Sequence, residues 1–287
     1  MSFNGKPIKG VLLDITGVLA ESSAEGDGQV IFGSVEAVKK LTDKGLLKHG
    51  KSRNEISPGV KVFPFSGIQV RFLTNETQRT RRNLMEKLHR LGFSMNETDI
   101  FPPALAMSSI ALEKNLRPFL LVHENVLPDL AAIPIAENYD SVVIGDAVDE
   151  FSYQNLNKAF RVLMASGGPL YTLGKGRFYR EDGELTLDVG AFAAALAFAA
   201  DREAIVCGKP APNFFATAIK DMGVRAEETL MVGDDIVSDV GGAQACGIKG
   251  ILVRTGKFQP QDENHPNVTP DKIVNNLAEI ADIIVSD

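Results

Sequence analysis

Short apolar runs alternate along the chain with longer stretches in which apolar residues recur every three or four positions. Runs of three or four apolar residues are typical of strands buried on both faces of a parallel sheet, whereas the longer spacing is typical of helices. Strands are predicted at residues 11–13, 70–73, 119–122, 142–144, 170–173, 204–207, 229–232 and 250–253. Helices are predicted at about 34–44, 77–91, 153–164, 212–222, 235–246 and 275–285, from Pro102–Pro103 onward, and in the alanine-rich segment after Asp188. This alternation predicts an α/β fold.

The alternation restarts in the middle of the chain, which predicts a second α/β module inserted into the first. We expect a core formed by residues 1–98 and 189–287 and an inserted domain at residues 99–188. Residues of about 46–69 fit neither period and are predicted to be an irregular insertion. The insertion is either an ordinary surface loop or part of a translated intron, because residues 63–67 (F-P-F-S-G) would be encoded by a pyrimidine run typical of a splice acceptor.

The charge and composition of the chain exclude several classes of partner. The 287 residues carry 37 acidic and 30 basic side chains without a basic stripe, so nucleic acid is not expected as a partner. No apolar run approaches the roughly 18 residues of a membrane span, and the amino-terminal segment lacks the apolar stretch of a signal peptide. Two cysteines are too few for a disulfide framework. We expect a cytoplasmic protein without a membrane contact, and a nuclear location stays open.

Polar side chains follow four of the predicted strands directly. They are Asp14; Thr74 and Asn75; Lys209; and Asp234, Asp235 and Asp239. In open α/β sheets ligands bind at the carboxyl ends of the strands, so these side chains are expected to lie close together. Two alternatives stay open at this point: Asp14 begins an ordinary turn, and Asp235 caps the helix that follows it.

The chemistry of this group of side chains is suited to phosphoryl transfer. Crowded carboxylates repel one another and persist when a cation neutralises them, and oxygen ligands in a cytoplasmic protein favour Mg²⁺. Asp14 supplies a carboxylate nucleophile. Thr74, the N–H of Asn75 and Lys209 supply hydrogen-bond donors and a positive charge. Together with the metal, these groups are able to attack a phosphorus atom and to stabilise the charge around it.

Four motifs, in this order, resemble those of the haloacid dehalogenase-like phosphatases. They are D-I-T-G-V-L at 14–19, L-T-N at 73–75, G-K-P at 208–210 and G-D-D-I-V-S-D at 233–239. The inserted module resembles the type-two cap of that family, and the resemblance implies a Rossmann-like parallel-sheet core. Four further segments resemble those members of the family that act on inorganic pyrophosphate, phosphohistidine and phospholysine. These segments are F-S-Y-Q-N-L-N-K-A-F, L-G-K-G-R-F-Y, L-D-V-G and V-R-T-G-K-F.

The resemblance also implies roles for individual residues. Asp14 would be the nucleophile that becomes an aspartyl-phosphate, and it would bind Mg²⁺ together with Asp234 and the backbone carbonyl of Thr16. Asp239 would orient the waters of the metal, and Asp235 would either assist it or cap the next helix. The residues that would bind the substrate are Asp14, Ile15, Thr16, Thr74, Asn75 and Lys209.

Thr16 departs from the pattern of the family in a way that affects the chemistry. Most phosphatases of the family have an aspartate two residues after the nucleophile, where it acts as general acid and then as general base. Threonine has no carboxyl group and cannot titrate near neutrality. A substrate whose leaving group needs no proton would tolerate this change, and pyrophosphate and protonated phosphoramidates are such substrates. The sequence therefore favours these two substrate classes.

Two other functions stay open beside this one. The first is a phosphatase of small phosphate esters, such as pyridoxal phosphate or a sugar phosphate, which Thr16 argues against. The second is a catalytically silent binding protein that retains the metal site. The expected partner is a small phosphorylated molecule or a protein that carries phosphohistidine or phospholysine. The sequence does not decide whether the chain forms a homodimer.

Overall fold

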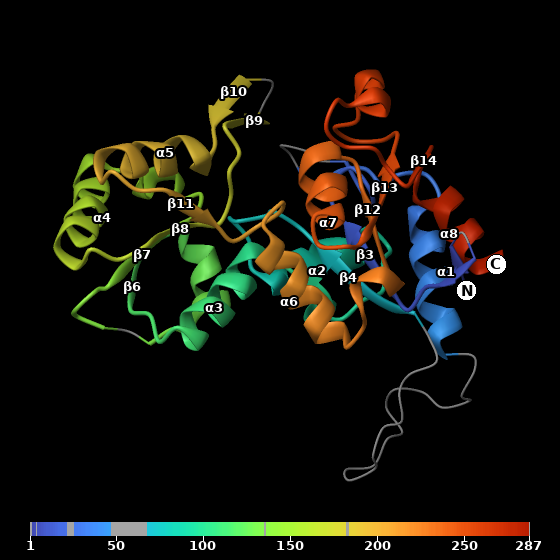
Figure 1. Cartoon of the computed structure of the whole chain (residues 1–287), viewed down its shortest axis with the longest axis horizontal. Coiled ribbons are helices and arrows are strands. Elements are labelled where there is room, and N and C mark those ends of the chain that lie inside the picture. Colours follow the sequence, from blue (N-terminus) through green and yellow to red (C-terminus); the bar gives the residue numbers. More distant parts are fainter. Residues whose placement is uncertain are drawn as a thin grey trace, which may run out of the picture. The chain divides into compact units, whose positions relative to one another are not determined.

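The computed structural model describes residues 2–3, 5–21, 26–46, 68–134, 136–181 and 184–286 (Figure 1). Apart from its ends, the predicted insertion at about 46–69 lies outside the described residues. The chain divides into two compact units. The first is Met1–Leu73, Lys87–Asp99 and Phe215–Asp287, and the second is Thr74–Glu86 and Ile100–Phe214. Helices α2 (Arg81–Arg90) and α6 (Pro212–Met222) are each divided between the two units.

The first unit contains parallel strands in the order β14-β13-β12-β3-β4. Their bounds are Lys272–Val274, Lys249–Val253, Thr229–Gly233, Gly10–Asp14 and Gln69–Leu73. Strand β3 lies between β12 and β4, and its residues Val11, Leu12 and Leu13 are completely buried. The chain therefore continues from β3 to β4 on one side, while β12 lies on the other. The carboxyl ends of β3 and β12 flank the switch point at which open α/β sheets bind ligands.

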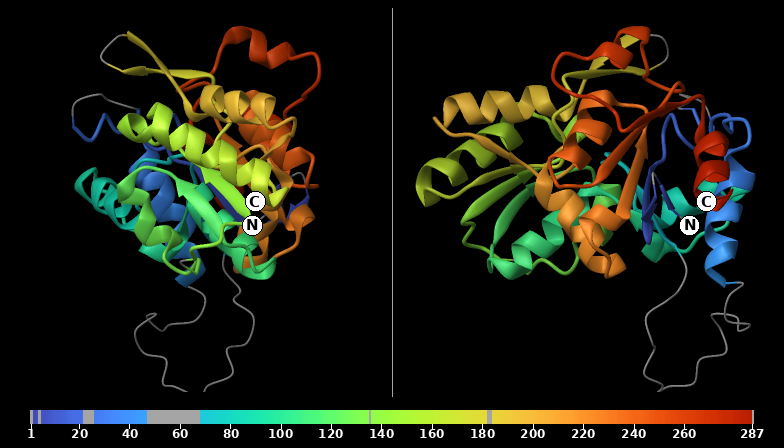
Figure 2. Two further views of the ribbon diagram at one scale, coloured as in Figure 1. Left: turned by 90° about the vertical axis from the view of Figure 1, so that its left-hand side faces the viewer. Right: turned by 45° about the vertical axis from the view of Figure 1, so that its right-hand side comes forward.

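Helices α1 (Ser34–Leu46) and α8 (Leu277–Ser286) pack side by side in the first unit (Figure 2). Lys40 Nζ and Asp282 Oδ1 join them over 2.6 Å. The apolar face of α1 holds Val38 and Leu41, both buried, as the helical spacing predicts. The hydroxyl of Ser34, the first residue of α1, donates to the carbonyl of Leu19 over 2.8 Å and so fixes the start of α1 to the loop after β3.

The remaining elements of the first unit are short. Strands β1 (Ser2–Phe3) and β2 (Lys6–Pro7) form an antiparallel pair. A π-helical turn at Ile236–Gly241 leads into α7 (Gly242–Gln244), in the region where one continuous helix was predicted. Such turns occur mostly as interruptions of α-helices and are frequent at functional sites.

The second unit contains a parallel sheet in the order β11-β8-β7-β6, with helices on both faces. The strands are Ala204–Val206, Leu170–Thr172, Ser141–Ile144 and Pro118–Leu121, and the helices are α3 (Pro103–Glu113), α4 (Tyr153–Ser166) and α5 (Val189–Ala199). Val142 and Ile144 pack in the cluster of α4 and α5, whereas Val143 packs in the cluster of α3. This alternation follows from the two-residue period of a strand.

Two features of the second unit go beyond the sequence pattern. Strand β11 pairs with β8, so residues 189–214, which were predicted as part of the core, lie in the second unit. Strands β9 (Phe178–Glu181) and β10 (Glu184–Leu187) form an antiparallel pair that was not predicted, and β5 (Ile100–Phe101) is a further short strand. The α/β fold class with parallel sheets is confirmed. Within the described ranges, no helix has the length and the apolar character needed to cross a bilayer.

Candidate active site

Asp14 is the last residue of the buried strand β3, and the residue is 8% exposed. The N–H of Ile15 donates to its Oδ1 over 2.8 Å, which orients the carboxylate at the strand end. The chain then turns at Gly17, whose φ is +85°. A Cβ at Gly17 would lie 2.0 Å from Asp234 Oδ2, so only glycine permits this turn to lie against Asp234.

Asp234 and Asp235 follow the neighbouring strand β12 and have different environments. Asp235 Oδ1 accepts the N–H groups of Val237 and Ser238 over 3.0 and 2.8 Å, so Asp235 caps the π-helical turn. Of the two roles that the sequence left open for Asp235, the structure shows the cap. Asp234 is 1% exposed, and its Oδ1 has no hydrogen-bond partner among the described residues.

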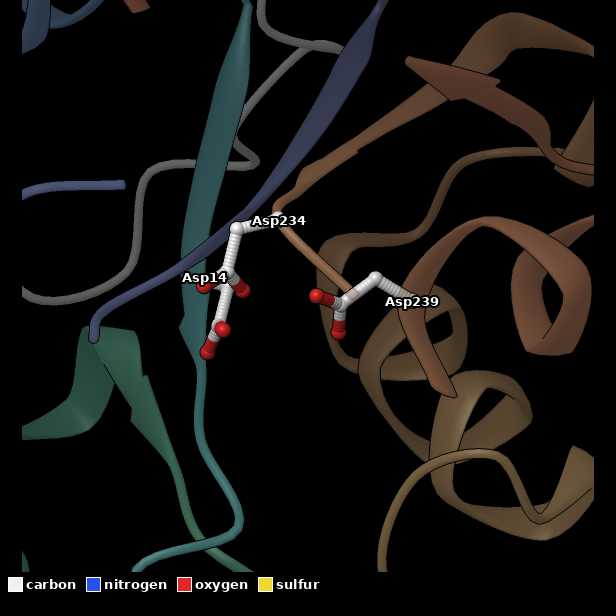
Figure 3. A group of neighbouring side chains, drawn as sticks. All are labelled: Asp14, Asp234 and Asp239. Carbon is white, nitrogen blue, oxygen red and sulfur yellow. The ribbon is translucent and has the colours of Figure 1, made fainter. Parts of the chain in front are cut away.

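Asp14, Asp234 and Asp239 form one acidic cluster, in which the ligand atoms all lie within 4.8 Å of one another (Figure 3). Asp239 comes from the turn after β12 and is completely buried. Burial, followed by the charges of Asp14 and Asp239, raises the pKa of Asp234 to about 8. Three buried carboxylates this close are unfavourable without a cation, and the unpartnered Oδ1 of Asp234 offers a ligand atom. Oxygen ligands of this kind fit a hard divalent cation.

The loop after β13 closes over the acidic cluster from a third strand end. The N–H of Lys257 donates to Asp234 Oδ2 over 2.7 Å, and the hydroxyl of Thr255 donates to the carbonyl of Gly17. Gly256 has a φ of +60°, and a Cβ there would lie 2.1 Å from Asp234 Oδ2. Sequence reasoning gave this loop no role. The signal was available, since T-G-K follows a predicted strand just as the other motifs do.

Lys257 places a cation beside the cluster. Its Nζ lies 3.7 Å from Asp235 Oδ2, and its side chain is 72% exposed. Desolvation lowers the pKa of Lys257, but the carboxylates around it outweigh this effect and raise the pKa overall. The largest of these electrostatic contributions comes from Asp235, followed by Asp234. Lys257 is therefore an ammonium ion throughout the neutral range.

The predicted site residues Thr74, Asn75 and Lys209 lie in the second unit, where Asn75 and Lys209 contact each other. Asn75 Oδ1 accepts the N–H of Lys209 over 2.9 Å, and Asn75 Nδ2 donates to the carbonyl of Lys209 over 3.1 Å. Lys209 is 4% exposed. Thr74 directly follows β4, and its hydroxyl accepts the N–H of Glu76 over 3.1 Å. The predicted meeting of these three residues with the acidic cluster stays a prediction.

Thr16 lies in the turn after β3 and is exposed. Its backbone forms an isolated bridge with Ala20, and the N–H of Gly17 donates to the carbonyl of Ala20 over 2.9 Å. This compact turn fixes the residues that follow Asp14. The roles predicted for the carbonyl of Thr16 and for Ile15 stay predictions.

Two family models match the chain: haloacid dehalogenase-like hydrolase at residues 11–133 and HAD-hydrolase-like at residues 206–280. The chain belongs to the haloacid dehalogenase-like hydrolases. The family resemblance seen in the sequence motifs is thereby confirmed.

Particular members of this family are similar to the chain over nearly its whole length. The chain is 45% identical over 280 residues to a Xenopus laevis protein named phospholysine phosphohistidine inorganic pyrophosphate phosphatase, covering 97% of this chain and 95% of the relative. A solved p-nitrophenyl phosphatase from Archaeoglobus fulgidus has a TM-score of 0.81 and 25% identity, covering 96% of this chain and 99% of the other. A glycerol phosphate phosphatase from Mycobacterium tuberculosis, solved in complex with magnesium, has the same fold, with a TM-score of 0.76 and 22% identity. The match covers 94% of this chain and 76% of the other.

Proposed function

We propose that the chain is a Mg²⁺-dependent phosphohydrolase that acts on inorganic pyrophosphate and on phosphoramidates such as phosphohistidine and phospholysine. The observation that carries this proposal is the buried cluster of Asp14, Asp234 and Asp239 at the ends of β3 and β12. A carboxylate nucleophile beside two further carboxylates requires a cation, and that cation favours the approach of a phosphoryl group. The name of the Xenopus laevis relative supports the substrate classes.

In this proposal the residues of the first unit hold the metal and form the covalent intermediate. Asp14, Asp234 and the carbonyl of Thr16 would bind Mg²⁺, and Asp239 would orient its waters. When bound, Mg²⁺ would offset most of the negative charge of the cluster and would polarise the phosphoryl oxygens. Asp14 attacks phosphorus, the bond to the leaving group breaks, and water then hydrolyses the aspartyl-phosphate. The N–H of Ile15 keeps the carboxylate of Asp14 at the strand end.

The second unit supplies the remaining substrate contacts in this proposal. Thr74 and the N–H of Asn75 would bind phosphoryl oxygens, together with the ammonium group of Lys209. The side chain of Asn75 already fixes the backbone of Lys209 by two hydrogen bonds. We propose that residues 99–188 of the predicted range form the cap domain within this unit, extended to about residue 207 because β11 pairs with β8. A cap excludes water and selects the substrate.

In this proposal, Thr16 determines which class of substrate the protein prefers. An alkoxide leaves slowly unless an acid protonates it, and Thr16 cannot act as that acid. The phosphate that leaves from pyrophosphate and the protonated nitrogen that leaves from a phosphoramidate both depart without this help. A second candidate, a phosphatase of small phosphate esters, is favoured by the likeness to a p-nitrophenyl phosphatase. We further propose a cytoplasmic location, as the low cysteine content of the sequence suggests.

A substrate panel tests the proposed function. Wild-type protein is assayed with and without Mg²⁺ on pyrophosphate, phosphohistidine, phospholysine and alkyl phosphates. Turnover that needs Mg²⁺ and prefers the first three substrates supports the proposal. A preference for alkyl phosphates supports the ester phosphatase instead. Binding of Mg²⁺ without turnover of any substrate would indicate a catalytically silent protein.

A further inference from the structure

Lys257 lies beside the acidic cluster, and the proposed chemistry gives it no role. Its own N–H donates to Asp234 Oδ2 over 2.7 Å, and the hydroxyl of Thr255, two residues earlier in the loop, donates to the carbonyl of Gly17. The position of its Cα relative to the cluster is therefore determined by the loop. Any side chain at position 257 starts from the edge of the candidate metal site.

The ammonium group of Lys257 is held much less tightly than its backbone. Its side chain is 72% exposed, and the 3.7 Å contact of its Nζ with Asp235 Oδ2 is a surface ion pair of small energetic value. Asp235 meanwhile uses its Oδ1 to cap the π-helical turn. Since the four-carbon stem of lysine is flexible, the ammonium group is able to leave Asp235 for a stronger anion nearby.

The charge of the site requires a cation of this kind. The carboxylates of Asp14, Asp234 and Asp239 outweigh a divalent cation by one negative charge, and Asp235 adds a further charge at the edge. Pyrophosphate is a multiple anion, so its two phosphate groups need more positive charge than the metal provides. Lys209 is assigned to the phosphoryl group that is transferred. The second phosphate group has no cation assigned to it.

We propose that Lys257 binds the second phosphate group of a pyrophosphate substrate and determines the specificity of the site for that substrate. This inference rests on the proposed function. As Asp14 forms its bond to one phosphorus atom, the bond from that atom to the bridging oxygen breaks. The bridging oxygen keeps the electron pair and leaves as part of orthophosphate. Lys257 donates a hydrogen bond to this leaving phosphate and stabilises its growing charge.

Two analogues that cannot be cleaved test the role of Lys257 by binding alone. Methylenediphosphonate carries two phosphonate groups, and methylphosphonate carries one. Titration calorimetry with Mg²⁺ present compares the wild type with Lys257→Met and Lys257→Arg. Lys257→Met should weaken binding of the diphosphonate about tenfold or more, and that of methylphosphonate less than about twofold, because a charge-assisted hydrogen bond is lost to the former alone. Lys257→Arg should retain diphosphonate binding to within about threefold, since it keeps the charge.

The controls separate the side chain from the loop. Lys257→Met keeps the backbone N–H that binds Asp234, and its melting temperature checks the fold. Lys40→Met removes a surface lysine that pairs with Asp282 in the same unit and should change neither affinity. Equal weakening of both analogues by Lys257→Met, or no weakening, overturns the inference. Turnover is scored separately: a protein that binds the diphosphonate through Lys257 but hydrolyses nothing contradicts the proposed function and supports the inference.

Discussion

The side chain of Asn75 binds the backbone of Lys209 on both sides, with its Oδ1 accepting the N–H over 2.9 Å and its Nδ2 donating to the carbonyl over 3.1 Å. These residues are 134 positions apart in the sequence, so the contact joins two motifs that the chain reaches at very different points. The motif L-T-N was expected to contribute its backbone N–H to the substrate. The carboxamide of Asn75 in addition holds the backbone of Lys209 in place.

Asn75→Ala should therefore lower kcat/KM by about 10- to 100-fold while leaving the backbone N–H of residue 75 in place, because small displacements of a substrate-binding group cost activity on this scale. Steady-state kinetics and thermal unfolding measure the two effects. Asn157→Ala is the matched control, since it removes an exposed carboxamide that donates to the carbonyl of Tyr153 on α4. Full activity of Asn75→Ala would show that the side chain does not position Lys209.

Asp14→Asn should abolish turnover, to below a few per cent of the wild-type rate, because a carboxamide is not a competent nucleophile. The same change removes one negative charge beside Asp234, whose pKa Asp14 helps to raise. The metal-free variant should therefore unfold at the same temperature as the wild type or a higher one. Activity assays and differential scanning calorimetry without Mg²⁺ test both expectations. Substantial residual activity would exclude Asp14 as the nucleophile.

Thr16 predicts a ranking of substrates. General acid catalysis typically contributes about 10²- to 10⁴-fold, and this contribution is missing for alkyl phosphates. We expect pyrophosphate and phosphoramidates to exceed alkyl phosphates by at least about tenfold in kcat/KM. Thr16→Asp should narrow this gap, since it restores a carboxyl group, although the new charge also acts on the metal site. Equal wild-type rates on both substrate classes would reveal another acid.

Binding of Mg²⁺ should compete with a proton at the acidic cluster. The pKa of Asp234 is raised from 3.8 to about 8, so the folded metal-free protein holds a proton that the unfolded chain releases above pH 3.8. The stability of the metal-free protein should therefore fall as the pH rises through this window. Because a ligating carboxylate is deprotonated, Mg²⁺ affinity should rise by up to about tenfold per pH unit below pH 8. Calorimetry in buffers of different ionisation enthalpy would detect the released proton, and a constant affinity without proton release would contradict the assignment.

A second pH effect comes from Glu228, which directly precedes β12 at the end of the strand opposite to Asp234. Hydrogen bonds from Arg225 and then from Lys9 lower the pKa of its carboxyl group from 4.5 to about 2. A lowered folded-state pKa stabilises the protein above pH 4.5, and this contribution is lost as the pH falls toward 2. Glu228→Gln should lower the melting temperature at pH 7, and its difference from the wild type should shrink below pH 4.5. Glu227→Gln, which changes an exposed partner of Arg225, is the control. A melting-temperature difference between Glu228→Gln and the wild type that does not depend on pH would argue against this role of Glu228.

The elements near the candidate site were predictable from the sequence because they depend on local patterns. The predicted strands at 11–13, 70–73 and 229–232 lie within β3, β4 and β12. Strands β3 and β12 are buried throughout, whereas β4 is only partly buried at Gln69 and Arg71. A polar residue at the end of such a run marks the edge of the sheet where ligands bind. The grouping of Asp14, Asp234 and Asp239 followed from this rule, and the structure brings these three residues together.

The remaining features depend on partners that are distant in the sequence. The short apolar run at 204–207 could not reveal which sheet it joins, and β11 pairs with β8 of the second unit. The predicted helix at 235–246 begins with a π-helical turn, at whose start Asp235 accepts two N–H groups. Lys257 received no role although the segment V-R-T-G-K-F contains it, because its contact with Asp234 is made by its backbone N–H, which a side-chain pattern does not register.

Gly17 and Gly256 leave no room for even one methyl group beside Asp234, since a Cβ at either position would lie 2.0 or 2.1 Å from its Oδ2. Both also have positive φ angles, which side chains disfavour. Evolution can therefore alter this site by changing whole loops or residues farther away, but not by adding a side chain to either of the two turns that enclose the carboxylate. In a library of random variants, Gly17 and Gly256 take no part in the chemistry, yet they should tolerate substitution as poorly as the three aspartates of the acidic cluster.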